Sequence, residues 1–162
     1  MSDVAGGDFP DGKQFAFTIV DDTDNGTVQN LAPVYELLTE LGFRSTKTVW
    51  PLDGIAGGGH SLEDLAYREF IVELSRLGFE IALHGVQNGD APRERIELGL
   101  DRFSQWIGSY PRIHCNHDHN RDNLYWDTSR IRSRMLRLIV HLATKGKLRG
   151  RLEGHREGSE FF

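Results

Sequence analysis

Cysteine is almost absent from this chain, because Cys115 is the only one among its 162 residues. A single thiol excludes an intramolecular disulfide framework and is typical of reducing compartments, so we expect a cytoplasmic location. Long apolar runs are also lacking, since no stretch approaches the roughly 20 apolar residues that cross a bilayer. The sequence therefore predicts no integral membrane segment.

The first residues lack the apolar stretch of a secretory signal. Segment 1–13 is acidic and contains glycine and proline, so we expect a loose leader before a single domain at 14–162. The composition, with 38% hydrophobic and 27% charged residues, is that of a soluble globular protein that can bury a core.

Charge is distributed unevenly along the chain. Residues 1–127 carry 10 basic and 21 acidic side chains, whereas residues 128–162 carry 9 basic and 3 acidic ones. Such a basic segment can bind phosphates or anionic lipid, but the commoner outcome is that it packs against the acidic body. Aromatic residues do not alternate with the basic ones as in nucleic-acid modules, so no nucleic-acid partner is expected.

Strand-like and helix-like segments alternate along the chain. Segments rich in β-branched and aromatic residues predict strands at 14–20, 44–50, 79–83 and 112–115. Apolar spacing predicts four helices. The first begins at Thr27 or Asn30 and ends at 41, and the second begins at a capping box formed by Ser61 and Asp64 and ends at 77. The third spans 92–107 with Asp90 as its cap, and the fourth spans 128–145. This alternation predicts βα units, a mainly parallel sheet and a ligand site at the carboxyl ends of the strands.

Polar side chains end two of these strands. Asp21 and Asp22 follow the first apolar run, and His84 follows the third. Neighbouring side chains of a strand point to opposite faces, so one aspartate can bind a metal ion while the other accepts a proton. An Asx turn or helix cap is the alternative for this pair, and Asp24 fits a cap or a supporting role.

A second polar cluster, HCNHDHNRDN, occupies residues 114–123. The spacing of His114, His117 and His119 is compatible with metal binding but matches no standard ligand motif, and a solvated loop is the alternative. Arg121 can pair with a site carboxylate and lower its pKa. Asn88, four residues after His84, offers an amide oxygen, which is a weaker metal ligand than imidazole.

Two of these patterns together resemble the polysaccharide deacetylase family, the metal-dependent N-deacetylases with a chitooligosaccharide-deacetylase homology domain. FTIVDD is similar to the first motif of the family, a strand followed by Asp-Asp, and EIALHGVQN is similar to the second, a strand followed by His-x-x-x-His. The third motif would fall near PRIHCNH, so the resemblance covers residues 14–125. The resemblance implies a distorted (β/α) barrel of the glycoside hydrolase/deacetylase type. The C-terminal part of that barrel is expected to be missing here, because the 162 residues hold only about five βα units.

The resemblance also implies roles for individual residues. Asp21 would be the general base, and Asp22 and His84 would bind a divalent metal ion, for which Zn²⁺ is the expectation. The third ligand of the family falls on Asn88, a departure from the usual histidine. The later motifs of the family, which supply a groove-lining segment and the catalytic-acid histidine, have no counterpart in this sequence. The remaining roles are therefore assigned from the second cluster and the tail and not from the resemblance. His119 or His155 is the candidate acid for the leaving amine, His117 and Arg121 are candidate substrate contacts, and His117 or His119 is a candidate additional ligand.

The expected function is that of a metal-dependent hydrolase that removes an N-acyl group, such as acetyl, from a carbohydrate. The first alternative is a non-catalytic deacetylase-like domain that binds carbohydrate or a partner protein. A weaker alternative is a dehalogenase-type phosphatase with an aspartate nucleophile, because hydrophobic-Asp-x-Asp occurs at 20–24, although Asn25 interrupts that motif. A homodimer would be one way to cover the sheet edge that an open barrel exposes.

Overall fold

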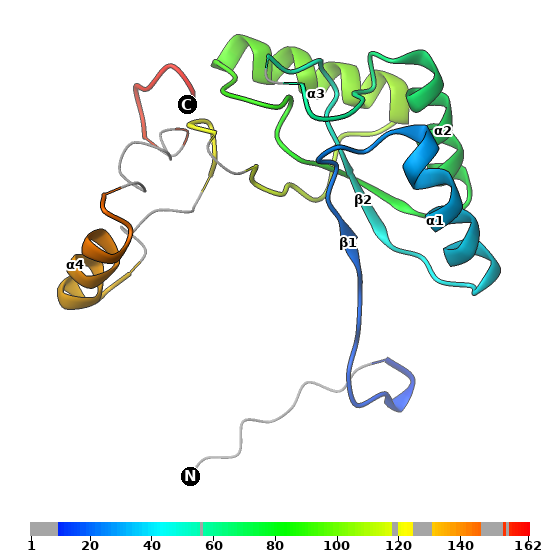
Figure 1. Ribbon diagram of the computed structural model, residues 1–162, viewed down its shortest axis with the longest axis horizontal. Helices are drawn as coiled ribbons and strands as arrows, with labels where there is room; N and C mark the ends of the chain where they lie inside the picture. Colours follow the sequence, from blue (N-terminus) through cyan, green and yellow to red (C-terminus); the bar gives the residue numbers. More distant parts are fainter. Residues whose placement is uncertain (1–9, 56, 118–119, 125–130, 147–153, 155) are drawn as a thin grey trace.

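The computed structural model describes residues 10–162, apart from 56, 118–119, 125–130, 147–153 and 155. Its centre is a parallel sheet of three strands, β1 (Val20–Asp21), β2 (Thr46–Val49) and β3 (Glu80–Leu83), in the order β1-β2-β3 (Figure 1). The strands thus follow one another across the sheet as they do along the chain. The mixed α/β class and the parallel sheet are confirmed, whereas the described residues do not show a full barrel.

Helices connect the strands and cover the sheet. They are α1 (Val28–Glu40), α2 (Leu65–Arg76) and α3 (Arg93–Ile107), with a short 3-10 turn, η1 (Pro10–Gly12), near the start. Right-handed crossovers between strands that advance in one direction place successive helices on the same face of a sheet. In agreement with this rule, α1 contacts α2 and α2 contacts α3 (Figure 1).

The core lies between the sheet and these three helices. Tyr35 of α1, Ile71 of α2 and Phe103 of α3 are buried there with Phe79 and Val49. The ring of Tyr35 meets that of Phe79 edge to face, with centroids 5.0 Å apart. All four residues of β2 are buried, and β2 is the central strand, paired with β1 on one side and β3 on the other.

Side chains cap the helices, but not always those that the sequence indicated. Thr27 caps α1 as predicted, since its Oγ1 accepts from the Asn30 amide at 3.3 Å. The predicted cap of the second helix was one turn too early, because Asp64 itself is the cap and its carboxylate accepts from the Tyr67 amide. The prediction of Asp90 as a cap was wrong, because its carboxylate accepts from the Arg121 amide and α3 starts after Pro92 without a side-chain cap.

The first and fourth strands are shorter than predicted. Of the expected strand at 14–20, only Val20 pairs with β2, followed by Asp21, and Phe15 and Phe17 are exposed. No partner strand lies beside residues 14–19 in the described part of the chain, so these residues form no ladder. The expected strand at 112–115 is reduced to a bridge between Leu83 and His114, with the Cys115 amide donating to the Leu83 carbonyl at 2.8 Å.

Helix α4 (Arg134–Ala143) stands apart from the sheet and its helices (Figure 1). It begins at the cap Ser133, so the helix predicted at 128–145 is shorter, and residues 128–130 lie outside the described part. None of its residues is buried, so the expected packing of the basic segment against the acidic body is wrong for this helix. The end of the segment does contact the body, because Arg93 donates to the Glu160 and Phe162 carbonyls. Across the described residues, no helix has both the length and the apolar character needed to cross a membrane.

Candidate metal centre

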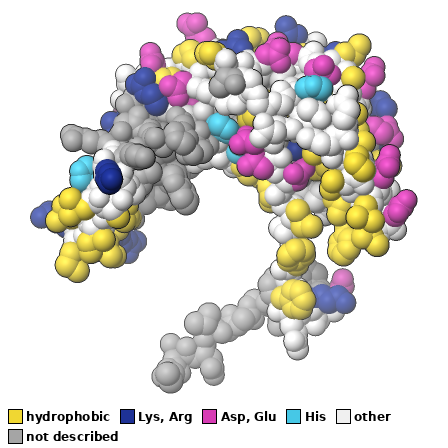
Figure 2. Space-filling model, in the orientation of Figure 1, with side chains coloured by type: hydrophobic (Ala, Val, Ile, Leu, Met, Phe, Trp, Pro, Cys, Tyr) yellow, Lys and Arg dark blue, Asp and Glu magenta, His cyan; other side chains and the backbone are white. Residues whose placement is uncertain are grey.

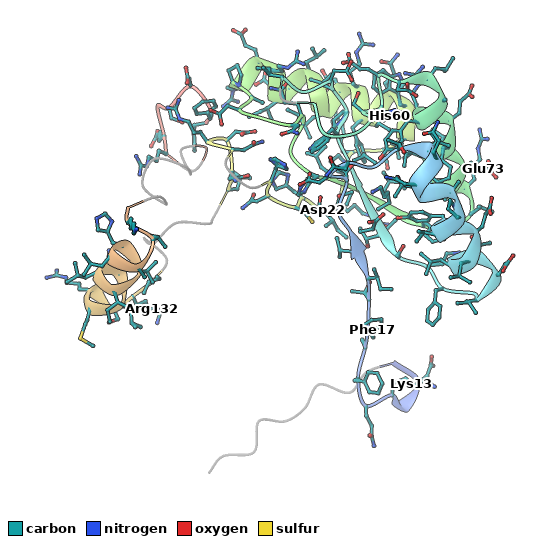
Figure 3. All side chains as sticks on the ribbon, in the orientation of Figure 1. Lys13, Phe17, Asp22, His60, Glu73 and Arg132 are labelled. Atoms are coloured by element: carbon teal, nitrogen blue, oxygen red, sulfur yellow. The ribbon has the colours of Figure 1, made fainter. Side chains whose placement is uncertain are left out.

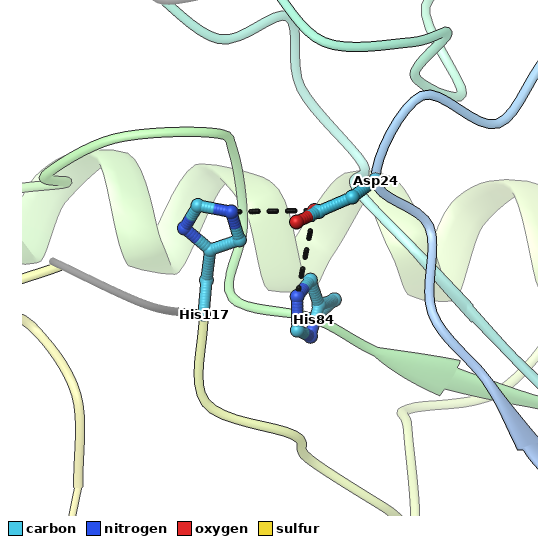
Figure 4. Close-up of side chains that lie close together, drawn as sticks. All are labelled: Asp24, His84 and His117. Atoms are coloured by element: carbon cyan, nitrogen blue, oxygen red, sulfur yellow. Dashed lines mark ion pairs between the residues drawn. The ribbon is translucent and has the colours of Figure 1, made fainter.

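Three polar side chains meet at the carboxyl ends of the parallel strands. Asp24 lies in the loop after β1, His84 directly follows β3, and His117 lies beyond the bridge that extends the sheet past β3. Figure 4 shows the two imidazoles converging on the carboxylate of Asp24, and Figure 3 places Asp22 at the same edge. This is the edge where the sequence predicted a ligand site.

The distances within this cluster suit a small metal ion. The Asp24 Oδ1 atom lies 3.7 Å from His84 Nε2 and 3.3 Å from His117 Nε2, and Asp22 Oδ1 lies 3.1 Å from His84 Nε2. Ligand atoms of Asp24, His84 and His117 all lie within 4.8 Å of one another. Around a tetrahedral zinc ion with bonds of about 2.0–2.1 Å, ligand atoms are roughly 3.3 Å apart. The donor set therefore fits such an ion with small side-chain movements.

One side of the cluster is closed and the other is open. The side chains of His84 and His117 are only 7% and 12% exposed, whereas those of Asp22 and Asp24 are 62% and 47% exposed. Buried Trp50 covers the closed side, with its ring centroid 6.2 Å from that of His84 and 5.6 Å from that of His117. A ligand or water molecule would therefore approach from the side of the carboxylates.

His84 is held in the form that can bind a metal ion. Burial lowers the pKa of its imidazole, and the nearby Asp22 carboxylate opposes this shift without reversing it. A neutral imidazole has the free lone pair that coordination needs. Within the described part of the chain, its buried Nδ1 atom has no hydrogen-bond partner, so the ring is oriented by packing against Trp50 and His117.

Glycines fix the loop that carries Asp24. The Gly26 amide donates to the Thr23 carbonyl at 2.8 Å, and its carbonyl accepts from the His60 amide at 2.8 Å. The Asn25 amide donates to the Gly58 carbonyl. A Cβ atom on Gly59, whose φ is +127°, would lie 2.8 Å from the Gly26 nitrogen, so a side chain there would push the two loops apart. The run of three glycines therefore sets the position of the aspartate loop.

Asp21 points away from the cluster, as alternation along a strand requires. Its Oδ2 atom lies 3.0 Å from the Lys47 ammonium and accepts from the Tyr35 hydroxyl at 2.9 Å. The Lys47 ammonium also donates to the Asp22 carbonyl at 2.9 Å. Burial lowers the pKa of Lys47, and the Asp21 carboxylate opposes that shift. The role of general base for Asp21 stays a prediction, and its carboxylate is engaged by two partners.

The other predicted site residues lie elsewhere or outside the described part. The Asn88 amide group donates to the Gly57 carbonyl, so it supports the glycine loop. The Arg121 guanidinium lies 4.8 Å from the centroid of the Phe161 ring and 3.8 Å from a Glu160 oxygen. His119 and His155, the candidates for the catalytic acid, lie outside the described residues.

Sequence reasoning underrated two members of this site. Asp24 was assigned a supporting role, yet its carboxylate is the one that both histidines contact. Trp50 was not considered, although it follows β2 and so ends at the same edge as the others. The rule that placed Asp22 and His84 would have found Trp50 too, because it applies to every strand of a parallel sheet.

No protein-family model, curated protein or solved structure matches this chain.

Proposed function

We propose that this chain is a metal-dependent hydrolase whose ion is held by Asp24, His84 and His117. The convergence of their ligand atoms at the carboxyl edge of the sheet is the observation that supports it. Two imidazoles and a carboxylate form a typical donor set of hydrolytic zinc sites, so Zn²⁺ is the expected ion. A bound zinc ion polarises a substrate carbonyl and lowers the pKa of a water molecule.

Asp22 is the residue that we assign to proton transfer. Its carboxylate lies 3.1 Å from His84 Nε2 and is 62% exposed, so it borders the open side of the cluster. Asp21 is the base that the resemblance implies, but its carboxylate is engaged by Lys47 and Tyr35. A carboxylate within reach of a water at the cluster can accept its proton, which contributes about 10²–10⁴-fold to such reactions.

The proposed substrate class is an N-acylated carbohydrate. The motifs FTIVDD and EIALHGVQN support it, because they supply both the aspartate pair and His84 in the order found in the deacetylases. The sheet supports the related fold assignment, a partial (β/α) barrel, since its strands advance in one direction with α1 and α2 in contact. An exposed pair of carboxylates beside a closed aromatic wall also suits a polar sugar.

The first experiment measures zinc in the purified chain by elemental analysis after dialysis against buffered Zn²⁺. The variants are Asp24→Ala, His84→Ala and His117→Ala, and the matched control is His141→Ala, on exposed helix α4. We expect near-stoichiometric zinc in the wild type and the control, and loss of zinc from the other three. A folded wild type without zinc, or equal zinc in all variants, would contradict the proposed centre.

The second experiment measures hydrolysis of N-acetyl chitooligosaccharides by the zinc-loaded chain. Asp22→Asn is expected to lose about 10²–10⁴-fold in kcat while it keeps its zinc. Asp21→Asn removes a carboxylate that the structure places on Lys47, and it should retain more activity than Asp22→Asn. The opposite order of the two variants would return the role of base to Asp21.

A non-catalytic binding domain is the second candidate, and one contact favours it. Asn88 stands where the family has a histidine ligand, and its amide nitrogen donates to the Gly57 carbonyl. A chain of this kind would bind chitooligosaccharides in a calorimetric titration without releasing acetate. Acetate release by the wild type and not by Asp22→Asn would exclude this candidate.

A further inference from the structure

Helix α4 carries a broad apolar face that the described part of the chain leaves uncovered. Met135, Leu138, Ile139 and Leu142 are 69%, 57%, 50% and 65% exposed. At about 100° per residue these side chains fall on one side of the helix. Figure 2 shows them as a patch of hydrophobic side chains on α4, away from the sheet. These four residues are called the apolar face of α4 below.

A basic face adjoins this apolar face. At about 100° per residue Arg134, Arg137 and His141 fall on it. Arg132 precedes the helix (Figure 3). The surrounding sequence, residues 128–152, contains eight arginine and lysine residues and no acidic residue. A short helix with a wide apolar face, a purely basic polar face and no acidic neighbours is typical of segments that bind the surface of anionic membranes.

The acidic body of the chain does not cover this helix. No residue of α4 is buried, and among the described helices and strands it makes no extensive contact with another element. A nucleic acid would satisfy the arginines but would leave the apolar face in water, because phosphate groups give no apolar contact. The inner part of a lipid headgroup layer satisfies both faces at once.

We propose that α4 binds the surface of a bilayer that contains anionic lipids, with its apolar face inserted among the upper acyl chains. Its 10 residues give a helix about 15 Å long, half of the roughly 30 Å of a hydrocarbon core, so α4 lies in the plane of the surface. The arginines of its polar face then reach the lipid phosphates. This inference does not depend on the metal centre, which lies at the edge of the sheet.

The test is vesicle flotation of the full chain. One set of vesicles contains phosphatidylcholine alone, and the other contains roughly one third phosphatidylserine. We expect the chain to float with the anionic vesicles and to stay in solution with the neutral ones. Salt at about 0.5 M should weaken the binding at least several-fold, because it screens the attraction between arginine and lipid phosphate.

Two variants separate the apolar and the basic contributions. Leu138→Glu/Ile139→Glu places two charges in the apolar face and is expected to abolish flotation. Arg132→Gln/Arg134→Gln, at two exposed arginines, should weaken binding about 25-fold, since each basic residue near an anionic surface contributes about fivefold. The matched control is Arg76→Gln/Arg112→Gln, which removes the same charge from exposed arginines of the sheet-and-helix body and should leave binding unchanged.

Three outcomes would overturn this proposal. They are the absence of flotation with anionic vesicles, equal binding to neutral vesicles, and equal weakening by the matched control. Analytical ultracentrifugation of the same samples identifies the rival occupant, a second copy of this chain. A wild-type dimer that Leu138→Glu/Ile139→Glu converts to a monomer, with no lipid binding by either protein, would assign the apolar face to self-association. Because α4 is exposed, these variants should keep the wild-type unfolding transition.

Discussion

Replacing Lys47 with methionine should destabilise the fold by about 3 kcal/mol. The Lys47 side chain is fully buried, and its ammonium lies 3.0 Å from the Asp21 carboxylate and donates to the Asp22 carbonyl at 2.9 Å. Methionine fills a similar volume but supplies neither the charge nor the hydrogen bond. The substitution therefore leaves a carboxylate without its cation and a carbonyl without its donor.

The magnitude follows from two opposing effects. At 3.0 Å and an effective dielectric constant of about 20, the attraction between the two charges is roughly 5 kcal/mol. Part of this attraction only offsets the loss of hydration of the ammonium in the folded state. The Asp21 side chain is 33% exposed and keeps its bond from Tyr35, so water and the phenol partly stabilise the carboxylate that remains. The net loss therefore lies at the low end of the roughly 3–5 kcal/mol for breaking a buried pair.

Urea unfolding followed by circular dichroism measures this loss. The double variant Lys47→Met/Asp21→Asn removes both charges, and it should be more stable than the sum of the single losses predicts, by about 1–3 kcal/mol. Lys13→Met, at an exposed lysine, is the control and should stay within about 0.5 kcal/mol of the wild type. Wild-type stability of Lys47→Met, or strict additivity of the two substitutions, would refute the reasoning.

Three further predictions concern other parts of the chain. Burial raises the pKa of Asp122 to about 6, so the carboxyl is neutral in the folded state at low pH, and its ionisation destabilises the fold as the pH rises through that value. Asp122→Asn should therefore add about 1–2 kcal/mol of stability at about pH 8 and almost nothing at about pH 4. Thermal unfolding at the two pH values measures the difference. Gly99→Ala should destabilise by about 1–3 kcal/mol despite the higher helix propensity of alanine, because the new Cβ would lie 2.5 Å from the Val86 Cβ. Urea unfolding measures the loss, and wild-type stability of Gly99→Ala would contradict the close approach. Thr27→Ala should cost about 1 kcal/mol in the same assay, because the Asn30 amide loses its cap.

Local patterns in the sequence predicted most of the elements of this fold. The helix that became α1 was placed correctly because a capping threonine and a terminating glycine mark its ends, and such signals act within a few residues. The strand predicted at 14–20 was mostly wrong, because its alternating apolar residues require a neighbouring strand that the described part of the chain does not contain. Strand formation depends on such distant partners, which a local pattern does not reveal.

The sequence predicted where in the fold the candidate site lies, but not all of the residues that form it. Asp22 and His84 follow from the rule that ligands gather at the carboxyl ends of parallel strands. The contact between Asp24 and His117 depends on how the loop after β1 turns, and that turn is set by the glycine loop 57–59 packing against it. The engagement of Asp21 by Lys47 likewise depends on the register between β1 and β2, in which the two residues are paired.

The order β1-β2-β3 has a consequence for how this chain folds. Each strand pairs with the one that follows it in sequence, so no pairing within the sheet has to close a loop longer than one crossover. The sheet can therefore grow one unit at a time. The pairing of Asp24 with His117 is different, because it joins the loop after the first strand to a segment beyond the last helix of the core. The proposed metal centre should consequently assemble late in refolding, after the helical signal has recovered, and an ion bound there would act mainly on the unfolding rate.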